Sequence, residues 1–266
     1  MNRLLGAIAL AGCLLAAPWA MNVPAGAQTT TAPASSSTRP GEKIPSEDSL
    51  ITNLHSLGLV DGHTDIFRSA CPVVDIAARM TTTQPTDAQF AAARQRMQHL
   101  YDLGIRTDIS FQTGAKGSAS GKSPGEANAI ALERAAAQSV GITFINDPMG
   151  NAGPDSLQTM SDQQVQAWLD AESGKILDNA KTGGVLFHCA AGHDRTGIVA
   201  AYIRIKFEHW SVDQAIDEMR KLGHSWIEFS ANGGVSSWHE DHLRDIAKTL
   251  TATPAESTPA RTGATP

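Results

Sequence analysis

Residues 185–197 read VLFHCAAGHDRTG, and this stretch decides how the rest of the chain is interpreted. Its first three residues form a short apolar run, which is typical of a buried strand. Cys189 comes two residues later, and five residues separate it from Arg195. A helical pattern follows over 195–208. The stretch therefore predicts a strand, a short loop and a helix, with a cysteine at the start of the loop and an arginine at the start of the helix.

This order predicts a phosphate-binding loop with a nucleophile at its base. Successive backbone N–H groups in such a loop converge on an anion, and the N-terminus of the next helix adds its own free N–H groups and positive dipole end. Gly192 lets the backbone turn, and the planar guanidinium of Arg195 can bind two phosphate oxygens. A thiol that faces these dipoles loses its proton easily, so Cys189 is expected to attack phosphorus as a thiolate. A buried structural cysteine is the alternative, but it leaves Gly192, Arg195, Thr196 and Gly197 unexplained.

The stretch resembles the active-site signature of the cysteine-dependent protein tyrosine and dual-specificity phosphatase superfamily, His-Cys-x5-Arg-Ser/Thr-Gly. Other segments are similar to the bacterial dual-specificity-type branch of that superfamily, and the similarity extends over about residues 59–250. These segments are FRSACP at 67–72, LGIRT at 103–107 and WSV at 210–212. The resemblance implies an α/β fold, with a central, mainly parallel sheet flanked by helices and the phosphate-binding loop between a strand and a helix.

The resemblance also implies a role for each residue of the stretch. Cys189 would form a phosphocysteine, and Arg195 would bind phosphate and stabilise the transition state. Thr196 would donate a hydrogen bond to the leaving thiolate, and His188 would orient the loop. The remaining substrate-binding residues would be Ala190, Ala191, Gly192, His193 and Gly197. The implied reaction needs neither a metal nor another cofactor.

Two aspartates are candidates for the general acid. Members of the superfamily usually carry this Asp about thirty residues before the cysteine, and Asp155 lies 34 residues before Cys189 in a Gly-Pro-Asp loop. Asp194 lies inside the loop, and its Gly-x-Asp-Arg-Thr context resembles phosphatases in which the loop Asp takes part in proton transfer. An Asp inside a phosphate-binding loop is otherwise an unfavourable charge. We therefore rank Asp194 ahead of Asp155.

The sequence favours a tyrosine or dual-specificity protein phosphatase, with phosphorylated proteins, small molecules or lipids as partners. Secreted cysteine phytases have a similar signature, so a secreted inositol phosphate or phosphoinositide phosphatase is the second interpretation. The loop offers only the partial positive charge of His193 for additional phosphates. A catalytically inactive phosphate-binding module is the alternative of another class. The formal net charge of −6 argues against a nucleic-acid binder that relies on a large basic surface.

Four further segments contain residue types that could carry chemistry. Cys71 belongs to the segment that packs near the loop in relatives, so we weigh a disulfide with Cys189 against a simple packed residue. Residues 61–65, DGHTD, are similar to the metal segment of membrane-type dipeptidases, but the core is short for their barrel of about 250 residues. Residues 116–123 only superficially resemble a nucleotide-binding loop. Residues 239–242, HEDH, are interpreted as the solvated start of a helix.

The two ends of the chain differ in composition from the middle. Residues 1–27 have one positive charge, an apolar run and a small-x-small site, which predicts a cleaved signal peptide. Cys13 lies in a lipobox-like context, so a lipid anchor or a retained membrane tether is the alternative. Residues 28–45 and 251–266 are low-complexity segments, which leaves one phosphatase domain at 46–250. We expect an exported protein, periplasmic or extracellular.

Hydrophobic periodicity assigns the elements of that domain. Strands are expected at 59–67 (or a hairpin), 105–111, 142–145 and 185–187. Helices are expected at 86–103, 126–140, from Ser161 onward, and at 195–208, 211–222 and 238–250. Ser161 and Gln164 form a predicted capping box. After the strand at 185–187, only helices are expected.

Overall fold

A five-stranded sheet forms the centre of the computed structural model, which describes residues 46–114, 126–148, 159–225, 228–229 and 235–252. The strands are β1 (His55–Gly58), β2 (Ile66–Ala70), β3 (Ile105–Ser110), β4 (Thr143–Asn146) and β5 (Gly184–Cys189). Their order is β1-β2-β5-β3-β4, and β1 alone among them pairs antiparallel with its neighbour. The predicted α/β architecture with a mainly parallel sheet is confirmed.

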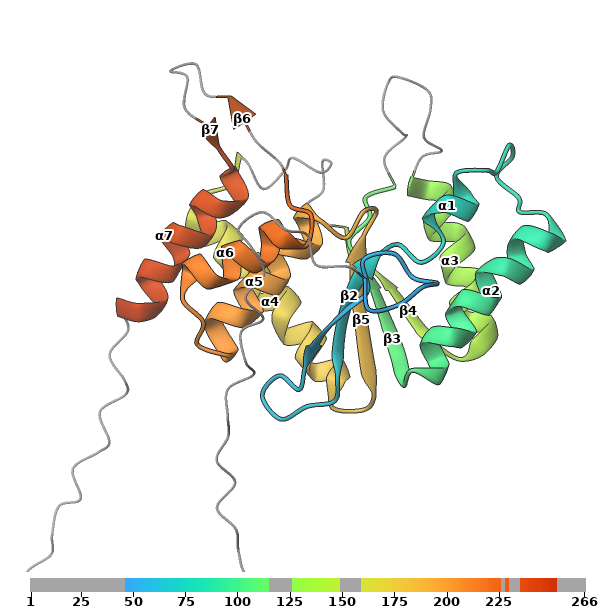
Figure 1. Ribbon diagram of the computed structural model, residues 1–266, viewed down its shortest axis with the longest axis horizontal. Helices are drawn as coiled ribbons and strands as arrows, with labels where there is room; N and C mark the ends of the chain where they lie inside the picture. Colours follow the sequence, from blue (N-terminus) through green and yellow to red (C-terminus); the bar gives the residue numbers. More distant parts are fainter. Residues whose placement is uncertain (1–45, 115–125, 149–158, 226–227, 230–234, 253–266) are drawn as a thin grey trace, which may run out of the picture. The chain divides into compact units, whose positions relative to one another are not determined.

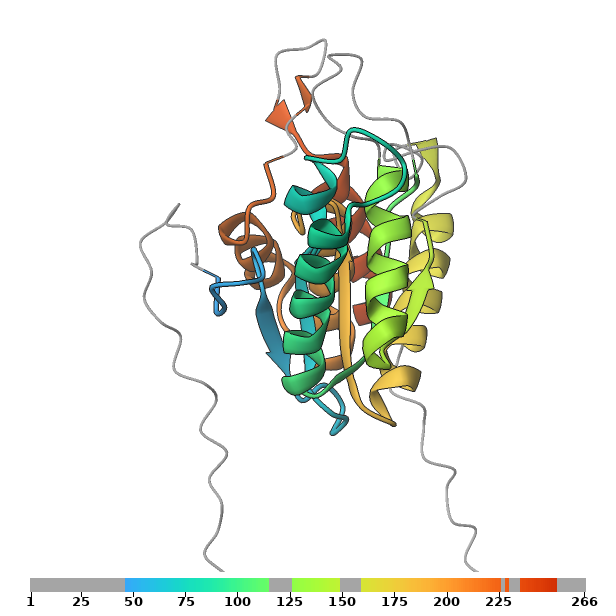
Figure 2. The ribbon, with the colours of Figure 1, turned by 90° about the vertical axis from the view of Figure 1, so that its right-hand side faces the viewer.

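Helices cover both faces of this sheet (Figure 1). One face carries α1 (Val74–Ala77), α2 (Asp87–Asp102) and α3 (Glu126–Val140), with α2 and α3 side by side in Figure 2. The other carries α4 (Asp162–Ala180), α5 (Asp194–Phe207), α6 (Val212–Lys221) and α7 (Trp238–Ala252). Because parallel strands are joined by crossover helices, this covering is the expected consequence of the strand order.

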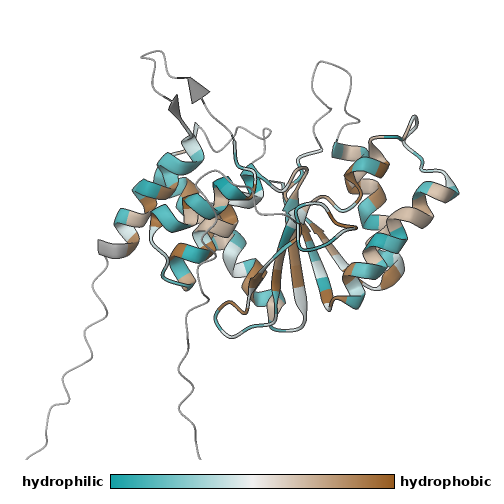
Figure 3. Cartoon of the chain, viewed as in Figure 1, coloured by the Kyte–Doolittle hydropathy of each residue, from teal (hydrophilic) through white to brown (hydrophobic). Residues whose placement is uncertain are grey.

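Strand β5 contributes to both hydrophobic cores. All six of its residues are buried, as expected for a central parallel strand. Successive side chains point to opposite faces: Val185 and Phe187 pack with α4–α7, whereas Leu186 packs with α2 and α3. Figure 3 shows hydrophobic and hydrophilic residues in both the strands and the helices. The strand that ends at Cys189 is therefore fixed by packing on both faces.

Side-chain caps determine where three of the helices begin. The residue before α4 is Ser161, whose hydroxyl accepts from the backbone N–H of Gln164, and the Gln164 side chain returns to the backbone of Ser161. This confirms the predicted capping box. The same reciprocal pattern starts α2 at Thr86 and α6 at Ser211, and each cap satisfies backbone N–H groups that have no partner inside the helix.

Of the two alternatives predicted for 59–67, the hairpin is confirmed and the single strand is wrong. Residues 59–65 form the turn of a hairpin whose strands, β1 and β2, lie on either side of it. Positive φ angles at Asp61 (53°) and Gly62 (74°) explain why a strand cannot continue through them.

The expectation that only helices follow β5 was also wrong. Two short strands, β6 (Glu228–Phe229) and β7 (Val235–Ser236), pair antiparallel before α7. The start of α7 is not solvated either, because His239 is 1% and Glu240 8% exposed. Its first turn packs against His224, whose ring centroid is 5.0 Å from that of His239.

Several predictions fall outside the described residues: the signal peptide, Cys13, the tether, the segment 116–123 and Asp155. Helix α7 reaches Ala252, two residues into the predicted tail, and the remainder of that tail is also outside the description. In the part of the chain that the structure describes, no helix combines the length and apolarity needed to cross a bilayer. All described residues belong to one compact unit within Arg39–Pro266.

Candidate active site

Cys189 is the last residue of β5, and α5 begins five residues later at Asp194. The loop between them therefore lies at the carboxyl edge of the parallel strands, where ligands bind in open α/β sheets. His193 occupies the position just before α5. Gly192 has a φ of +71°, and a Cβ there would lie 2.4 Å from the backbone oxygen of Ser69. The predicted strand–loop–helix arrangement and the need for glycine are both confirmed.

Neighbouring side chains hold the carbonyl groups of this loop. The Gly192 oxygen accepts from Arg68 Nη2 at 2.6 Å and from Asn53 Nδ2 at 3.0 Å. The Ala190 oxygen accepts from the backbone N–H of Cys71 at 3.2 Å. Because these carbonyls are bound from outside, the loop can present N–H groups toward Cys189, as the backbone N–H groups of Gly192 and Thr196 do. This is the geometry of an anion-binding nest.

Competing effects set the acidity of the Cys189 thiol. Burial raises its pKa, but the charge of Arg195, the Thr196 hydroxyl and the two backbone N–H groups lower the pKa below its ordinary value. The buried Thr196 hydroxyl makes no other hydrogen bond of normal geometry, so it is available to the sulfur. The thiolate form that nucleophilic attack requires is therefore favoured.

Arg195 is held beside the loop by groups from two other elements. Its Nη2 lies 2.5 Å from Glu126 Oε1, and its Nη1 donates to the Phe111 carbonyl at 3.0 Å. Glu126 in turn accepts from the backbone N–H of Thr113 at 2.7 Å. Burial lowers the pKa of Arg195, but the negative charges of Cys189 and Glu126 raise it above its ordinary value. The guanidinium stays charged and fixed in direction, as the binding of phosphate oxygens requires.

Asp194 pairs with a histidine that the sequence had not suggested. Its Oδ1 accepts from His224 Nδ1 at 2.6 Å, and His224 Nε2 lies 2.8 Å from Ser237 Oγ. Burial raises the pKa of Asp194, but the hydrogen bond and charge of His224 lower the pKa below its ordinary value. His224 therefore holds the Asp194 carboxyl group in place at the start of α5. Its role as general acid stays a prediction, as does that of Asp155.

His188 lies on the opposite face of β5 from Cys189 and is completely buried. Its Nδ1 is 3.1 Å from the Cys189 carbonyl oxygen, which can only accept, so Nδ1 carries a proton. Its Nε2 lies 3.2 Å from Asp108 Oδ1 and 3.2 Å from Glu133 Oε1. Burial lowers the pKa of His188, but these two carboxylates raise it well above its ordinary value. The predicted orienting role has a physical basis in the bond from Nδ1 to the Cys189 backbone.

The structure does not bring the other predicted chemistry together. Both Cys71 and Cys189 are free, and Cys71 Sγ lies 3.7 Å from the Glu133 carboxylate, in the core on the other face of the sheet. Residues 61–65 lie in the β1–β2 turn, at the edge of the sheet opposite to Cys189. Among the described residues, the side chains of that turn form no group that could share one ion.

Comparison with known proteins agrees with this geometry. Residues 86–205 match the model of a family described as the tyrosine phosphatase family. The similarity to this family is thus located in residues 86–205, which include Cys189 and Arg195. A stretch of 68 residues is 34% identical to the dual specificity protein phosphatase TpbA of Pseudomonas aeruginosa strain UCBPP-PA14, covering 26% of this chain and 31% of that protein. The chain thus spans about a third of the length of this curated relative.

The solved structures of phosphatases that are similar to this chain have lower sequence identity to it. The crystal structure of P. aeruginosa TpbA is 20% identical, covers 80% of this chain and 96% of that chain, and has a TM-score of 0.46. The core catalytic domain of the PP-IP phosphatase SIW14 from S. cerevisiae is 14% identical, covers 80% and 98%, and has a TM-score of 0.36.

Sequence reasoning missed four residues that shape this candidate site. Arg68 and Asn53 hold the loop carbonyls, Glu126 holds Arg195, and His224 holds Asp194. Arg68 belongs to the FRSACP segment, which the resemblance singled out, but the resemblance assigned no role to this arginine. Glu126 lies 69 residues from Arg195, and no local pattern connects them.

Proposed function

We propose that the chain hydrolyses phosphate monoesters through a phosphocysteine intermediate and acts as a tyrosine or dual-specificity protein phosphatase. Similarity to the tyrosine phosphatase family implies phosphorylated substrates. The observation that carries the proposal is the placement of a buried, acidified Cys189 thiol beside a guanidinium held by Glu126. The name of the curated relative, a dual specificity protein phosphatase, supports the substrate class.

In the proposed reaction, the phosphate binds to the loop N–H groups and to Arg195. The Cys189 thiolate attacks phosphorus, the S–P bond forms, and the P–O bond to the leaving group breaks as that oxygen receives a proton. Water then attacks phosphorus, the S–P bond breaks, and inorganic phosphate leaves while the thiolate is restored. Such covalent catalysis divides one difficult displacement into two easier steps, and the preorganised N–H groups and Arg195 stabilise charge in both.

The test is hydrolysis of an aryl phosphate by the full chain with reductant and chelator. We expect Cys189→Ser to abolish turnover while vanadate still binds, and rapid quenching of the wild type to trap a phosphorylated Cys189 peptide. Arg195→Lys keeps the charge but loses the planar fork, so its activity should fall sharply. Arg79→Lys is the matched control, because Arg79 is 71% exposed and pairs with Asp75 away from the loop. Turnover that survives Cys189→Ser would refute the mechanism.

The substrate class needs a separate measurement. Phosphotyrosine peptides, phosphoserine and phosphothreonine peptides, phosphoinositides and phytate are compared by kcat/KM at equal enzyme concentration. The proposal expects the phosphopeptides to be preferred. A preference for phytate or phosphoinositides would instead favour an inositol phosphate or phosphoinositide phosphatase.

The general acid is assigned by varying the leaving group. A variant without its general acid loses most activity on a phenyl phosphate, whose leaving oxygen needs the proton, and least on a nitrophenyl phosphate. We propose that Asp194→Asn shows this pattern, with a loss of about 10²–10⁴-fold on the poorer leaving group. If Asp155→Asn shows it and Asp194→Asn does not, the acid is Asp155.

We also propose that the chain is exported, on the basis of residues 1–27 alone. N-terminal sequencing of the mature protein tests this, with cleavage before Gln28 as the expected result. A mature protein that begins at a lipid-modified Cys13 would instead establish the anchored form.

A further inference from the structure

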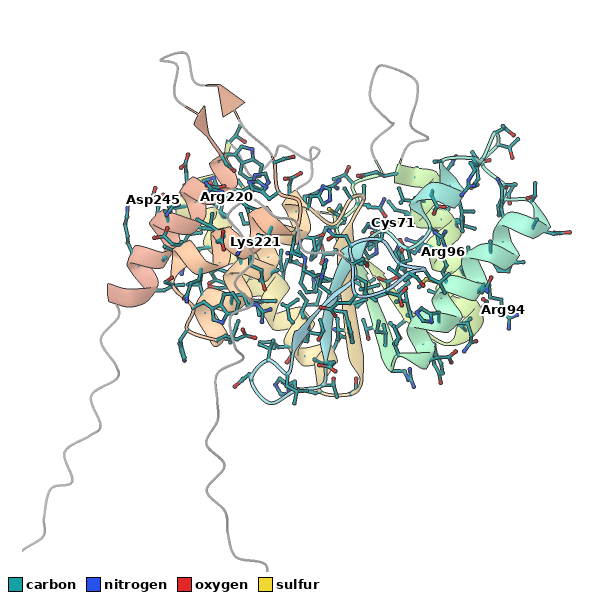
Figure 4. The ribbon with its side chains drawn as sticks, in the orientation of Figure 1. Cys71, Arg94, Arg96, Arg220, Lys221 and Asp245 are labelled. Carbon is teal, nitrogen blue, oxygen red and sulfur yellow. The ribbon has the colours of Figure 1, made fainter. Side chains whose placement is uncertain are left out.

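A cluster of four ionisable side chains lies behind the phosphate-binding loop, on the face of the sheet that α3 covers. Cys71 follows β2, Asp108 is on β3, Glu133 is on α3 and His188 is on β5. Their exposed fractions are 2%, 0%, 0% and 0%. Figure 4 places Cys71 beside α1, on this side of the sheet. Groups of this kind are seldom buried together unless they are paired or bind a metal.

Three of the four groups are spaced like ligands around one small ion, and the fourth, Asp108, lies against His188. His188 Nε2 lies 3.2 Å from both Asp108 Oδ1 and Glu133 Oε1, and Cys71 Sγ lies 3.7 Å from both Glu133 oxygens. The ligand atoms of Cys71, Glu133 and His188 all lie within 4.8 Å of one another. Tetrahedral zinc with bonds of about 2.0–2.3 Å places its ligand atoms roughly 3.3–3.6 Å apart.

The orientation of His188 suits a metal ligand. Its Nδ1–H donates to the Cys189 carbonyl oxygen at 3.1 Å, which leaves Nε2 to face the cluster. Metal-binding histidines usually donate their second ring N–H to a carbonyl or carboxylate in this way.

Hydrogen bonds within the cluster leave several atoms without partners. Both carboxylate oxygens of Asp108 and Nε2 of His188 are buried, and none makes a hydrogen bond of normal geometry. A buried polar atom without a partner costs about 1–3 kcal/mol, and more when it is charged. One proton on Nε2 can serve only one carboxylate oxygen, whereas a cation attracts all of them.

We propose that this cluster binds a divalent transition-metal ion, zinc in the first instance. Its ligands are Cys71 Sγ, a Glu133 oxygen and His188 Nε2, with the Asp108 carboxylate as the fourth. Binding replaces the protons on Sγ and Nε2, which pass to solvent, and no electron is transferred. The ion links the β2–α1 junction, β3, α3 and β5, and it fixes the backbone that carries Cys189. This inference goes beyond the proposed hydrolysis and does not depend on it.

The first test is the metal content of the full chain, purified without metal-affinity resin or chelator. Elemental analysis should find about one ion per chain in the wild type. Cys71→Ser and Asp108→Asn should lower this content, whereas Asp102→Asn, at the exposed end of α2, should not. Wild-type protein without stoichiometric metal, even after dialysis against zinc, would overturn the proposal.

The second test identifies the sulfur. The metal is removed, cobalt(II) is added, and the absorption spectrum is recorded. Thiolate-to-cobalt charge transfer should appear in the wild type and in Cys189→Ser, and it should be lost in Cys71→Ser. A band that disappears with Cys189→Ser and persists with Cys71→Ser would overturn the proposal, because the ion would then lie in the phosphate-binding loop.

Folding of the variants is checked by circular dichroism. If Cys71→Ser does not fold, thermal unfolding of the metal-depleted wild type with and without zinc decides instead. A rise in Tm with added zinc that persists in Cys189→Ser supports the site, because a ligand that binds only the folded state raises its stability. An unchanged Tm would overturn it.

Discussion

Gly192 determines the shape of the loop between Cys189 and α5. Its φ of +71° lies in the left-handed region, and the space where a Cβ would lie is filled by the backbone of Ser69, with the oxygen at 2.4 Å and the carbon at 2.5 Å. Backbone atoms of a central strand cannot move aside in the way that a flexible side chain can. Close approach between the loop and β2 therefore requires glycine here, and this approach also lets Arg68 reach the Gly192 carbonyl.

Replacing this glycine should damage the site and the fold together. Gly192→Ala is expected to lose about 1–3 kcal/mol of unfolding free energy from backbone strain alone, and to lose vanadate binding because the loop must move. Urea unfolding and a binding titration measure the two effects. Gly174→Ala is the control: a Cβ at this α4 position meets nothing within 4 Å, so stability should rise by about 0.5–1 kcal/mol. Normal vanadate affinity in Gly192→Ala would contradict the argument.

Glu126 acts on the reaction through Arg195. Glu126→Gln removes the charge of the pair but keeps a group of the same size. A hydrogen bond to a charged group is worth about 1.5–3 kcal/mol, so kcat/KM for an aryl phosphate should fall by roughly one to two orders of magnitude. Asp245→Asn, in the exposed pair with Lys248 on α7, is the matched control (Figure 4). An unchanged kcat/KM would mean that the Phe111 carbonyl and the substrate are sufficient to place Arg195.

At the scale of elements, an ion pair joins the short helix α1 to α2. The Asp75 carboxylate on α1 accepts from Arg96 on α2, with Oδ2 3.0 Å from Nη2, and from Arg79, two residues after the end of α1, at 2.6 Å. Arg96 also donates to the Pro72 carbonyl at 2.7 Å. A four-residue helix has little stability of its own, so these contacts from α2 help to fix the chain just after Cys71.

This pair predicts a pH dependence of stability. The hydrogen bond from Arg96 lowers the pKa of Asp75 below its ordinary value of 3.8, against the raising effect of partial burial. A lowered pKa means that the stabilisation is complete above pH 3.8 and is lost as the pH falls through the folded-state pKa. Asp75→Asn should therefore be about 0.5–1 kcal/mol less stable than the wild type at pH 7, a small value because the carboxylate is 45% exposed.

Urea unfolding of both proteins at neutral pH, at about pH 5 and at about pH 3 measures this difference. The difference in unfolding free energy should be the same at neutral pH and at about pH 5, and it should be smaller at about pH 3. Asp102→Asn serves as the control, because its carboxylate accepts from the Gln98 amide rather than from a cation. A stability difference that grows as the pH falls would contradict this role of the Asp75 carboxylate.

At the scale of the whole molecule, the two hydrophobic cores share the sheet. Leu186 belongs to the core under α2 and α3, and Phe187, the next residue of the same strand, belongs to the core under α4–α7. Because one buried strand contributes to both cores, neither core can open while the other keeps β5 in place. We therefore expect the described unit to unfold in one cooperative transition.

Shortening a core side chain on either face of the sheet should lower stability, but unfolding should remain a single transition. Leu186→Ala is expected to cost about 2–5 kcal/mol and Phe187→Ala about 3–5 kcal/mol, measured by urea unfolding with both circular dichroism and tryptophan fluorescence. Leu59→Ala, at a 67% exposed position in the β1–β2 turn, should change stability by less than about 0.5 kcal/mol. Two separate transitions in either core variant would show that the cores unfold independently.

The sequence by itself determined the strand–loop–helix unit around Cys189, because all of its determinants are local. The apolar run, the glycine at a positive φ and the arginine at the helix start lie within a few residues of one another. The capping box at Ser161, which begins α4, is equally local. The sheet class followed from the alternation of strand and helix patterns. The single-strand alternative at 59–67 was wrong because a hairpin turn at Asp61 and Gly62 has no hydrophobic period to mark it.

Only the tertiary structure decided which distant side chains support the loop. Arg68, Glu126 and His224 reach it from β2, α3 and the segment after α6, and their contacts depend on the strand order β1-β2-β5-β3-β4. The same order brings Cys71, Asp108 and Glu133 to His188. Pairing between strands and packing of helices onto a sheet are long-range interactions, so no local pattern of residue types contains them. The local structure around Cys189 could therefore be predicted from the sequence, whereas its supporting residues became visible only in the folded molecule.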